Sequence, residues 1–360
     1  MYSGNTPSRL NKEHFKGTVN WISSGELKEH YIYSSKEQIS EEAAKSLKLL
    51  PVGTFVIAIY GLEAEGVRGT GSITQEPSTI SQACMSFIPK GVIENEFLYS
   101  WYKKHGNVIG IRYAQGTKQQ NLSYDILEKF RIAYPNTKEQ EKLNKFISLL
   151  DERISTQNKI IDKLQTLIKG IVDSTILRKE KNAIVGDVCS ISEQIRAEAN
   201  IDDIITVRLH GNGVCKSSAE NLQLGATQYY RRRAGQLIYG KQNFHNGAIG
   251  IVPISLDNGI TSKDIPSFDI DEMKCNSVYL LAQLQSPQYY KPAEALTTGT
   301  GSKRLKEETF LKMPIVLPNK REQDNIATLI ISISANLDQA KKMLDLFSIQ
   351  KQYLLRQMFI

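Results

Sequence analysis

The chain has 360 residues, of which 41% are hydrophobic and 23% are charged, and its formal net charge is +7. One hydrophobic core usually serves no more than ~250–300 residues, so the length predicts at least two domains. The positive charge admits an anionic partner, nucleic acid first, without requiring one.

The cysteines and the apolar runs bear on the compartment. Cys84, Cys189, Cys215 and Cys275 are far apart and form no Cys-x-x-Cys pair. This spacing argues against a disulfide framework and a zinc site, and it suits a reducing cytoplasm. The N-terminus has no signal-like apolar region, and no apolar run reaches ~18 residues. We therefore expect a soluble, cytoplasmic protein that does not associate with a membrane.

The first globular segment is expected over residues 1–134. Residues 19–22 and 53–60 are rich in β-branched and aromatic side chains and are bounded by glycine or proline, which predicts strands. Residues 37–50 predict a short helix closed by a proline, and residues 97–105 predict a second helix that stops at a glycine. This mixture indicates an α+β domain.

A long helix is expected over residues 135–181, because its apolar residues recur in alternating steps of four and three. Thr137 and Gln140 have the spacing of a capping box directly after a proline, which predicts the helix start. Such an apolar stripe needs a partner helix, since it is not stable in water. The seam consists of Leu150, Ile154, Ile161, Leu164, Ile168 and Ile171, interrupted by Gln157.

The second globular segment is expected over residues 182–317, again as an α+β domain. It opens with strand-like residues 184–190, and its further predicted elements are strands around 204–209, 236–239 and 248–254 and a helix over 276–284. A second long helix is expected over residues 318–360. Its seam consists of Ile333, Leu337, Ala340, Leu344, Phe347, Leu354 and Met358, interrupted by Lys351.

The two halves repeat one plan. Residues 116–140 and 299–323 lie 183 positions apart and share a Gly-Thr loop, a Pro-Asn pair and a Glu-Gln pair. The second long helix therefore supplies the partner that the first one needs. One asymmetry breaks the repeat, because the run 183–194 has no counterpart before Ser3. Either the first domain starts upstream of Met1, or the chain is naturally short there.

Motifs for catalysis were searched for and are missing from the sequence. There is no Gly-x-x-x-x-Gly-Lys-Ser/Thr loop, no Gly-x-Gly-x-x-Gly after a strand, no His-Glu-x-x-His and no Gly-x-Ser-x-Gly. Asp264, Glu272 and Lys274 have a spacing seen in nuclease metal sites, although a solvated acidic turn is several times more common. We therefore expect a protein that is not an enzyme and uses no cofactor or metal.

Candidate DNA contacts flank a predicted strand of the second segment. Arginine and lysine suit phosphates and guanine edges, while glutamine and asparagine suit adenine edges. A solvated basic patch is the alternative for the three arginines. The candidates are Arg231, Arg232, Arg233, Lys241, Gln242, Asn243 and His245.

The first segment and the two Gly-Thr loops supply further candidates. Backbone N–H groups of a Gly-rich loop approach phosphates, and both loops carry amides or cations. The alternatives are that Ser23 and Ser24 cap a turn and that Trp21 belongs to the core. The candidates are Ser8, Arg9, Ser23, Ser24, Tyr60, Arg68, Gln82, Lys118, Gln119, Gln120 and Asn121, with Lys303 and Arg304 in the second loop.

Several ordered motifs carry a family resemblance. Ser3–Arg9, Trp21–Leu27, Leu50–Thr54 and Ile80–Cys84 resemble the target recognition domain of type I restriction–modification specificity subunits. The Pro-Asn…Glu-Gln start of each long helix is similar to the spacer regions of that family. The second domain departs from the pattern, because Ser190–Gln194 does not have the form of the first motif.

The resemblance implies a non-catalytic DNA reader that binds neither S-adenosylmethionine nor ATP. Each recognition domain would read one half of a bipartite site in double-stranded DNA. The two helices would pack antiparallel, set the spacing between the half-sites and dock DNA methyltransferase subunits, and restriction subunits would join for cleavage. Two alternatives stay open: a coiled-coil tethering protein without DNA specificity, and a nuclease around Asp264.

Overall fold

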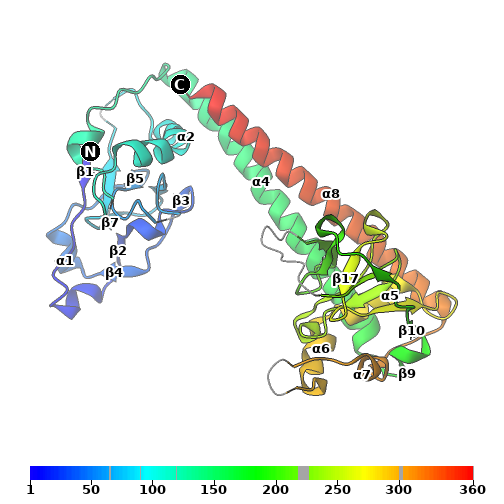
Figure 1. Ribbon diagram of the computed structural model, residues 1–360. Helices are drawn as coiled ribbons and strands as arrows, with labels where there is room; N and C mark the ends of the chain where they lie inside the picture. The colour runs from blue at the N-terminus through cyan, green and yellow to red at the C-terminus, as the bar shows by residue number, and fades with distance from the viewer. Residues whose placement is uncertain (65, 90, 119, 218–226, 300–302, 360) are drawn as a thin grey trace. The chain divides into compact units, whose positions relative to one another are not determined.

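The computed structural model describes residues 1–64, 66–89, 91–118, 120–217, 227–299 and 303–359. The chain divides into two compact units (Figure 1). Unit 1 comprises residues 1–157 and 343–360, and unit 2 comprises residues 158–342. Both long helices, α4 (Thr137–Val172) and α8 (Lys320–Met358), contribute to both units. Within the described ranges, no helix is long and apolar enough to cross a membrane.

Unit 1 contains a five-stranded sheet in the order β1-β8-β5-β6-β3. Its centre is β5 (Phe55–Ala58), which pairs antiparallel with β6 (Gly71–Thr74) and β8 (Cys84–Phe87). β1 (Tyr2–Ser3) pairs antiparallel with β8, and β3 (Tyr31–Ile32) pairs parallel with β6. All four residues of β5 are buried, as expected for a continuous apolar run in the middle of a covered sheet.

A three-stranded sheet completes the β structure of unit 1. β2 (Val19–Ile22) pairs antiparallel with β4 (Glu37–Ile39) and parallel with β7 (Ser78–Ile80). The prediction of a helix over 37–50 was therefore wrong at its start, because residues 37–39 pair with β2. The helix α1 is only Glu41–Lys45, and the Ser40 side chain caps it by accepting from the Ala43 N–H.

The helix α2 (Asn95–Tyr113) packs on β5 and β6 and is longer than the predicted 97–105. The prediction ended it at Gly106, but this glycine lies inside the helix against Gly69 and the Tyr102 ring. A Cβ at Gly106 would come within 2.8 Å of that ring, so close packing explains the glycine. The remaining helix of unit 1 is α3 (Tyr124–Leu127).

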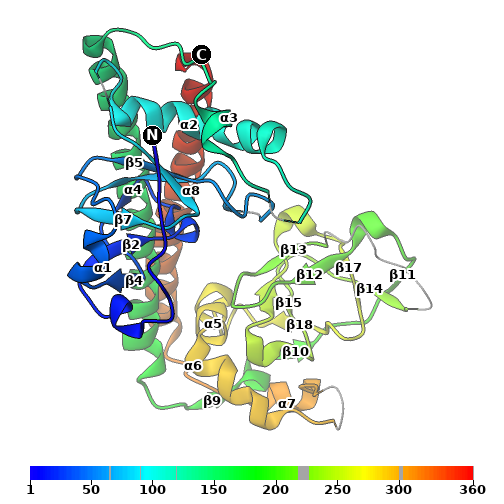
Figure 2. The same cartoon turned by 90° about the vertical axis from the view of Figure 1, so that its left-hand side faces the viewer.

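Unit 2 contains a four-stranded antiparallel sheet in the order β10-β18-β15-β16 (Figure 2). Its strands are β10 (Cys189–Ile191), β18 (Ser267–Ile270), β15 (Leu237–Tyr239) and β16 (Ile249–Ile251). Helix α5 (Ser277–Leu284) packs against β16, and the cap at Asn276 matches the predicted helix start. The predicted strands around 236–239 and 248–254 are confirmed as β15 and β16.

Three smaller sheets and two short helices complete unit 2. The predicted strand around 204–209 is confirmed as β12. The strands are β11 (Arg196–Ala197), β14 (Tyr229–Arg231) and β17 (Ile260–Ser262) in one sheet, β12 (Ile205–Val207) with β13 (Val214–Lys216), and β9 (Ala183–Ile184) with β19 (Pro314–Ile315). The helices are α6 (Pro287–Tyr290) and α7 (Glu307–Leu311).

The sequence repeat corresponds to a structural one. The order β8-β5-β6 in unit 1 matches β18-β15-β16 in unit 2. In the same way, β1 pairs with β8 and β10 pairs with β18. The pair β9–β19 has no counterpart among the described strands of unit 1, because residues 131–134 form no strand. The prediction that the run 183–194 has no counterpart was therefore right for β9 but wrong for β10, which corresponds to β1.

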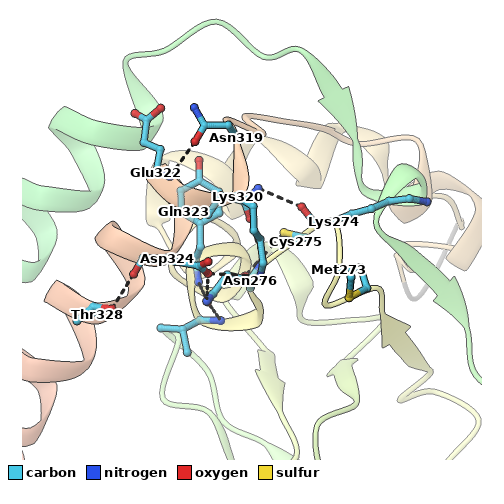
Figure 3. A network of polar contacts seen from close by, with 12 residues as sticks. Met273, Lys274, Cys275, Asn276, Asn319, Lys320, Glu322, Gln323, Asp324 and Thr328 are labelled. Atoms are coloured by element: carbon cyan, nitrogen blue, oxygen red, sulfur yellow. Dashed lines mark hydrogen bonds and ion pairs between the residues drawn. The ribbon is translucent and has the colours of Figure 1, made fainter.

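A buried glutamine fixes the start of each long helix. In unit 2, the Gln323 side chain accepts from the Asn276 N–H (2.8 Å) and donates to the carbonyl oxygens of Lys274 (3.1 Å) and Pro318 (2.9 Å) (Figure 3). In unit 1, Gln140 accepts from the Glu94 N–H (2.9 Å) and donates to the carbonyl oxygens of Val92 and Pro135. The repeated Pro-Asn…Gln spacing therefore joins each helix start to the turn before α2 or α5.

The two long helices run antiparallel within each unit. In unit 1, the Arg153 guanidinium lies over the Phe347 ring, while Asp151, earlier in α4, pairs with Lys351, later in α8. Lys351, the polar residue that interrupts the predicted seam, thus forms an ion pair with Asp151 of the other helix. In unit 2, the end of α4 packs into the same core as the start of α8, with Ile168 and Val172 beside Ile326 and Ile330. The predicted seam residues are the less exposed ones along both helices.

Candidate nucleic-acid interface

Three segments meet beside the end of the central strand in each unit. In unit 1, the Ile59 N–H donates to the Ala83 carbonyl and the Leu122 N–H donates to the Ile59 carbonyl, both at 2.9 Å. In unit 2, the Lys241 N–H donates to the Asp264 carbonyl and the Leu305 N–H donates to the Lys241 carbonyl, again at 2.9 Å. Each Gly-Thr loop is therefore tied to the loop that follows the central strand.

We call this arrangement the loop edge of a unit. The loop edge of unit 1 consists of the described residues 59–64, 66–68, 81–84, 115–118 and 120–122. The loop edge of unit 2 consists of residues 240–247, 262–265, 298–299 and 303–305. Twelve of the predicted contact residues lie on the two edges, six in unit 1 (Tyr60, Arg68, Gln82, Lys118, Gln120 and Asn121) and six in unit 2 (Lys241, Gln242, Asn243, His245, Lys303 and Arg304). Gln119 lies outside the described residues.

The loop edge of unit 1 is dominated by amides. The Gln120 side-chain oxygen lies 3.5 Å from Arg68 Nη2, and the Gln120 N–H donates to Glu63 Oε2 at 2.8 Å. This N–H holds the pKa of the Glu63 carboxyl below its usual range. Gln82 and Lys118 are exposed. Arg68 Nε and Asn121 Oδ1 are buried and have no hydrogen-bond partner among the described residues. Both atoms have hydrogen-bonding capacity that a ligand could use.

Arg68 is positioned by α2. A Cβ at Gly110 would lie 2.6 Å from the Arg68 Cγ, so only glycine leaves room for this side chain to lie along the helix. The neighbouring Gly69 has a positive φ of 71° and its backbone contacts Asn107 of the same helix. The loop after β5 is therefore supported by α2 rather than free.

The loop edge of unit 2 is dominated by charges. Lys241 Nζ lies 2.6 Å from Glu307 Oε1, and the lysine side chain is only 12% exposed. Arg304 Nη2 lies 3.4 Å from Asp264 Oδ2, and Lys303 Nζ lies 3.3 Å from Glu294 Oε1. Gln242 and Asn243 are exposed, and His245 is half-buried beside Asn246. The three predicted cations of this edge are thus all paired with carboxylates.

The three arginines at 231–233 have different environments. Arg231 and Arg233 are exposed, but Arg232 is fully buried. Its guanidinium donates to Thr261 Oγ1 (2.7 Å), Ser267 Oγ (2.9 Å), the Ile265 carbonyl (2.9 Å) and Gln194 (3.3 Å). Burial lowers the pKa of Arg232 to about 10. The expectation that Arg232 neutralises a phosphate is therefore corrected, because its guanidinium is enclosed by β17 and β18.

The remaining candidates of unit 1 lie by the three-stranded sheet. Arg9 makes two hydrogen bonds to the Glu37 carboxylate (3.0 and 2.8 Å), which hold the pKa of Glu37 below its usual range. The Arg9 guanidinium also lies over the rings of Phe15 and Trp21. Trp21 is buried and its indole N–H donates to the Asn5 carbonyl, so it belongs to the core. The structure brings Arg9 and Ser8 to a different place from the loop edge.

Ser23 and Ser24 follow β2. The Ser23 hydroxyl and N–H both donate to Glu26 Oε2, and the Glu26 N–H donates to the Ser23 carbonyl, so Ser23 and Glu26 close the turn between them. Ser24 is the first residue of the 3₁₀ turn that this cap closes. The turn-capping alternative thus explains Ser23.

Sequence reasoning missed the carboxylates of the loop edges as part of the candidate site. Glu63, Glu294 and Glu307 were not singled out, and Asp264 was considered only for a nuclease. Across the described residues, no group of three or more histidine, cysteine or acidic side chains is arranged to hold a metal. Proximity in sequence does not identify the partners, because Glu307 is close to Lys303 in the chain but pairs with Lys241, while Lys303 pairs with Glu294.

Part of the chain is similar to known proteins. Residues 2–166 match the type I restriction modification DNA specificity domain. The chain is 31% identical over 170 residues to the type I restriction enzyme MjaIX specificity subunit of Methanocaldococcus jannaschii, covering 45% of this chain and 38% of that protein. It is 30% identical over 168 residues to the EcoR124I/EcoR124II specificity subunit of Escherichia coli, covering 45% of this chain and 40% of that protein.

The fold agrees over the whole chain. The crystal structure of the type I restriction-modification S subunit from M. genitalium matches with a TM-score of 0.61 at 14% identity, covering 100% of this chain and 93% of that one. The chain thus has a two-part α+β fold like that of this S subunit. It is similar to type I restriction–modification specificity subunits. The matched stretches span less than half the length of the two curated relatives.

Proposed function

We propose that this chain is the DNA-reading subunit of a type I restriction–modification complex, and that each loop edge reads one half of a bipartite site. The observation that carries the proposal is the duplicated loop edge. The same backbone hydrogen bonds hold three segments together in both units, while the side chains on them differ. A shared frame with different polar side chains suits two readers of two different sequences.

Polar side chains on the two edges are the proposed contacts. Those of Gln82, Lys118, Gln242, Asn243, Lys303 and Arg304 are exposed, and the others are half-buried. In unit 1, Gln82, Gln120 and Asn121 read bases and Arg68, Lys118 and Tyr60 approach the backbone or guanine edges. In unit 2, Gln242, Asn243 and His245 read bases and Lys303 and Arg304 contact phosphates or guanine. Gln119, which is outside the described residues, stays a candidate. Further candidates away from the edges are the exposed Arg231 and Arg233, and Ser8, Arg9, Ser23 and Ser24. Lys241 is the weakest of the set, because its ammonium is already held by Glu307.

The helices are proposed to set the half-site spacing and to dock DNA methyltransferase subunits, with restriction subunits joining the complex. Support for docking comes from α8 in unit 1. Met343, Leu346, Ile349 and Tyr353 recur at steps of three or four and are all more than a third exposed. An exposed apolar row on a paired helix is a feature of interaction surfaces. Under this proposal the chain itself carries out no catalysis.

The test is selection of a binding sequence by the full-length chain from a pool of duplex DNA with randomised sequence. We expect an enriched motif with two separated halves. Gln120→Ala should relax one half only, and Gln242→Ala should relax the other half only. Each change should lower the preference for the cognate base by about 1–3 kcal/mol.

Two results would contradict the proposal. A chain that enriches no sequence at low salt is better described as a coiled-coil tether. If both variants relaxed the same half, or neither half, the assignment of one half-site to each loop edge would be wrong. Arg131→Ala, an exposed change outside both edges, serves as the control and should leave the motif unaltered.

A further inference from the structure

An acidic side chain stands on the loop edge of unit 2, where a DNA ligand would bring phosphates. Asp264 Oδ2 lies 3.4 Å from Arg304 Nη2, and the two side chains are 51% and 45% exposed. A carboxylate at a DNA interface is repelled by phosphates unless a donor meets it. The donors that DNA offers to a carboxylate in the major groove are base amino groups, above all cytosine N4.

Both residues are held in place by the backbone. The Asp264 carbonyl accepts from the Lys241 N–H (2.9 Å), and the Asp264 N–H donates to Ser262 Oγ (3.3 Å). Arg304 exchanges two backbone hydrogen bonds with Thr298, at 2.9 and 3.0 Å. The adjacent Leu305 N–H donates to the Lys241 carbonyl (2.9 Å). The turn and the loop are thus both hydrogen-bonded to Lys241, two residues after β15, and the side chains of Asp264 and Arg304 are next to each other.

A stabilising role does not account for this pair. A single contact of 3.4 Å between half-exposed groups contributes little to folding in water. The nearby Lys241–Glu307 pair is different, because it is shorter at 2.6 Å and only 12% and 27% exposed. Asp264 and Arg304 therefore keep most of their hydrogen-bonding capacity for a ligand.

We infer that Asp264 and Arg304 together read one C·G base pair in the half-site of unit 2. Asp264 accepts a hydrogen bond from cytosine N4, and Arg304 donates to guanine O6 and N7 of the same pair. The neighbouring acid and cation match the neighbouring donor and acceptors that a C·G pair presents in the major groove. This inference rests on the proposed function and assigns one base pair to one loop edge.

Unit 1 lacks this pair of charges. The backbone positions equivalent to Asp264 and Arg304 are Ala83, whose carbonyl accepts from Ile59, and Asn121, which bridges to Gln115. An alanine offers no acceptor to cytosine, and an asparagine suits adenine. The requirement for C·G therefore belongs to the half-site of unit 2 only.

The test uses the full-length chain, the same randomised duplex pool and sequencing of the bound fraction. The wild-type chain should enrich a motif with an invariant C·G pair in one half. Asp264→Ala and Arg304→Gln should each relax that position by about tenfold or more and leave all other positions unchanged. Asp264→Asn should shift the preference at that position towards adenine. Glu272→Gln, at an exposed acid between β18 and α5, is the matched control and should change nothing.

The outcomes separate this inference from the proposed function. If the wild-type chain enriches a two-part motif that the Asp264 and Arg304 variants leave unchanged, the base-pair assignment is wrong and the proposed function stands. If the variants lower affinity for every sequence equally, Arg304 contacts phosphate and the assignment is again wrong. Failure of the wild-type chain to enrich any motif would overturn both.

Discussion

The two loop edges have the same backbone hydrogen bonds but different side-chain contacts, amides in unit 1 and ion pairs in unit 2. In unit 1, Arg68 meets the Gln120 amide, and buried polar atoms of Arg68 and Asn121 have no partner among the described residues. In unit 2, Lys303 and Arg304 are paired with Glu294 and Asp264. The frame is kept because backbone hydrogen bonds form it, and these do not depend on side-chain identity. The side chains are therefore free to differ, which is what two readers of different sequences require.

A second comparison concerns the position before the central strand. Leu50 in unit 1 and Arg232 in unit 2 hold equivalent places, each donating its backbone N–H to the neighbouring β7 or β17 region. Both side chains are fully buried. Leu50 packs in the apolar core of unit 1, whereas Arg232 makes four side-chain hydrogen bonds between β17 and β18. The same fold thus accepts a leucine or a fully hydrogen-bonded guanidinium at one site.

The largest expected effect comes from replacing the buried arginine of unit 2 by the leucine that unit 1 has at the equivalent place. Arg232→Leu should destabilise unit 2 by about 3 kcal/mol, because it removes the guanidinium donor from Thr261 Oγ1 and Ser267 Oγ and leaves the Ile265 carbonyl with the Thr261 hydroxyl alone. Hydrogen exchange should show lost protection in β14, β17 and β18, with unit 1 unchanged. The control is Arg231→Leu, at an exposed site, which should alter stability by less than about 0.5 kcal/mol. Equal effects of the two variants would refute the structural role of Arg232.

A smaller effect is expected from replacing the buried glutamine that both units have near the start of a long helix. Gln140→Ala and Gln323→Ala should each destabilise their own unit by about 2 kcal/mol, because each leaves one N–H and two carbonyl groups unsatisfied. Denaturant unfolding with hydrogen exchange would assign the loss to a unit. Replacement by glutamate keeps the acceptor but removes the donor. Gln323→Glu should therefore destabilise unit 2 at least as much as Gln323→Ala does. If only one glutamine mattered, the two helix starts would not be equivalent.

The sequence predicted what local pattern and repetition determine. The seam positions, the starts of α4 and α8 shortly after Pro135 and Pro318 and the strands around β5 and β15 follow from periodicity and turn residues. The contact between the Gly-Thr loop and the end of the central strand cannot be predicted in this way. It depends on hydrogen bonds between residues such as Ile59 and Leu122 that are far apart in sequence. Three consecutive arginines look alike in sequence, yet only the middle one is buried. Which cation has an acidic partner likewise depends on tertiary contacts, as with Lys241 and Glu307.

The smallest expected effect compares one lysine from each loop edge. Lys118 in unit 1 is exposed and forms no ion pair with a described acidic residue, whereas Lys303 in unit 2 pairs with Glu294 at 3.3 Å. Binding of DNA by Lys303 must first release this carboxylate, so part of its charge is already neutralised. Lys118→Ala should therefore lower the slope of log affinity against log salt by about 1, and Lys303→Ala by less. Neither change should alter which sequence is preferred.

The measurement is the affinity for one duplex over a series of salt concentrations. Glu294→Gln removes the carboxylate, so in that variant Lys303 should contribute as much to the salt dependence as Lys118 does. If Lys303→Ala changed the slope as much as Lys118→Ala in the unmodified background, the pairing with Glu294 would have no influence on DNA binding.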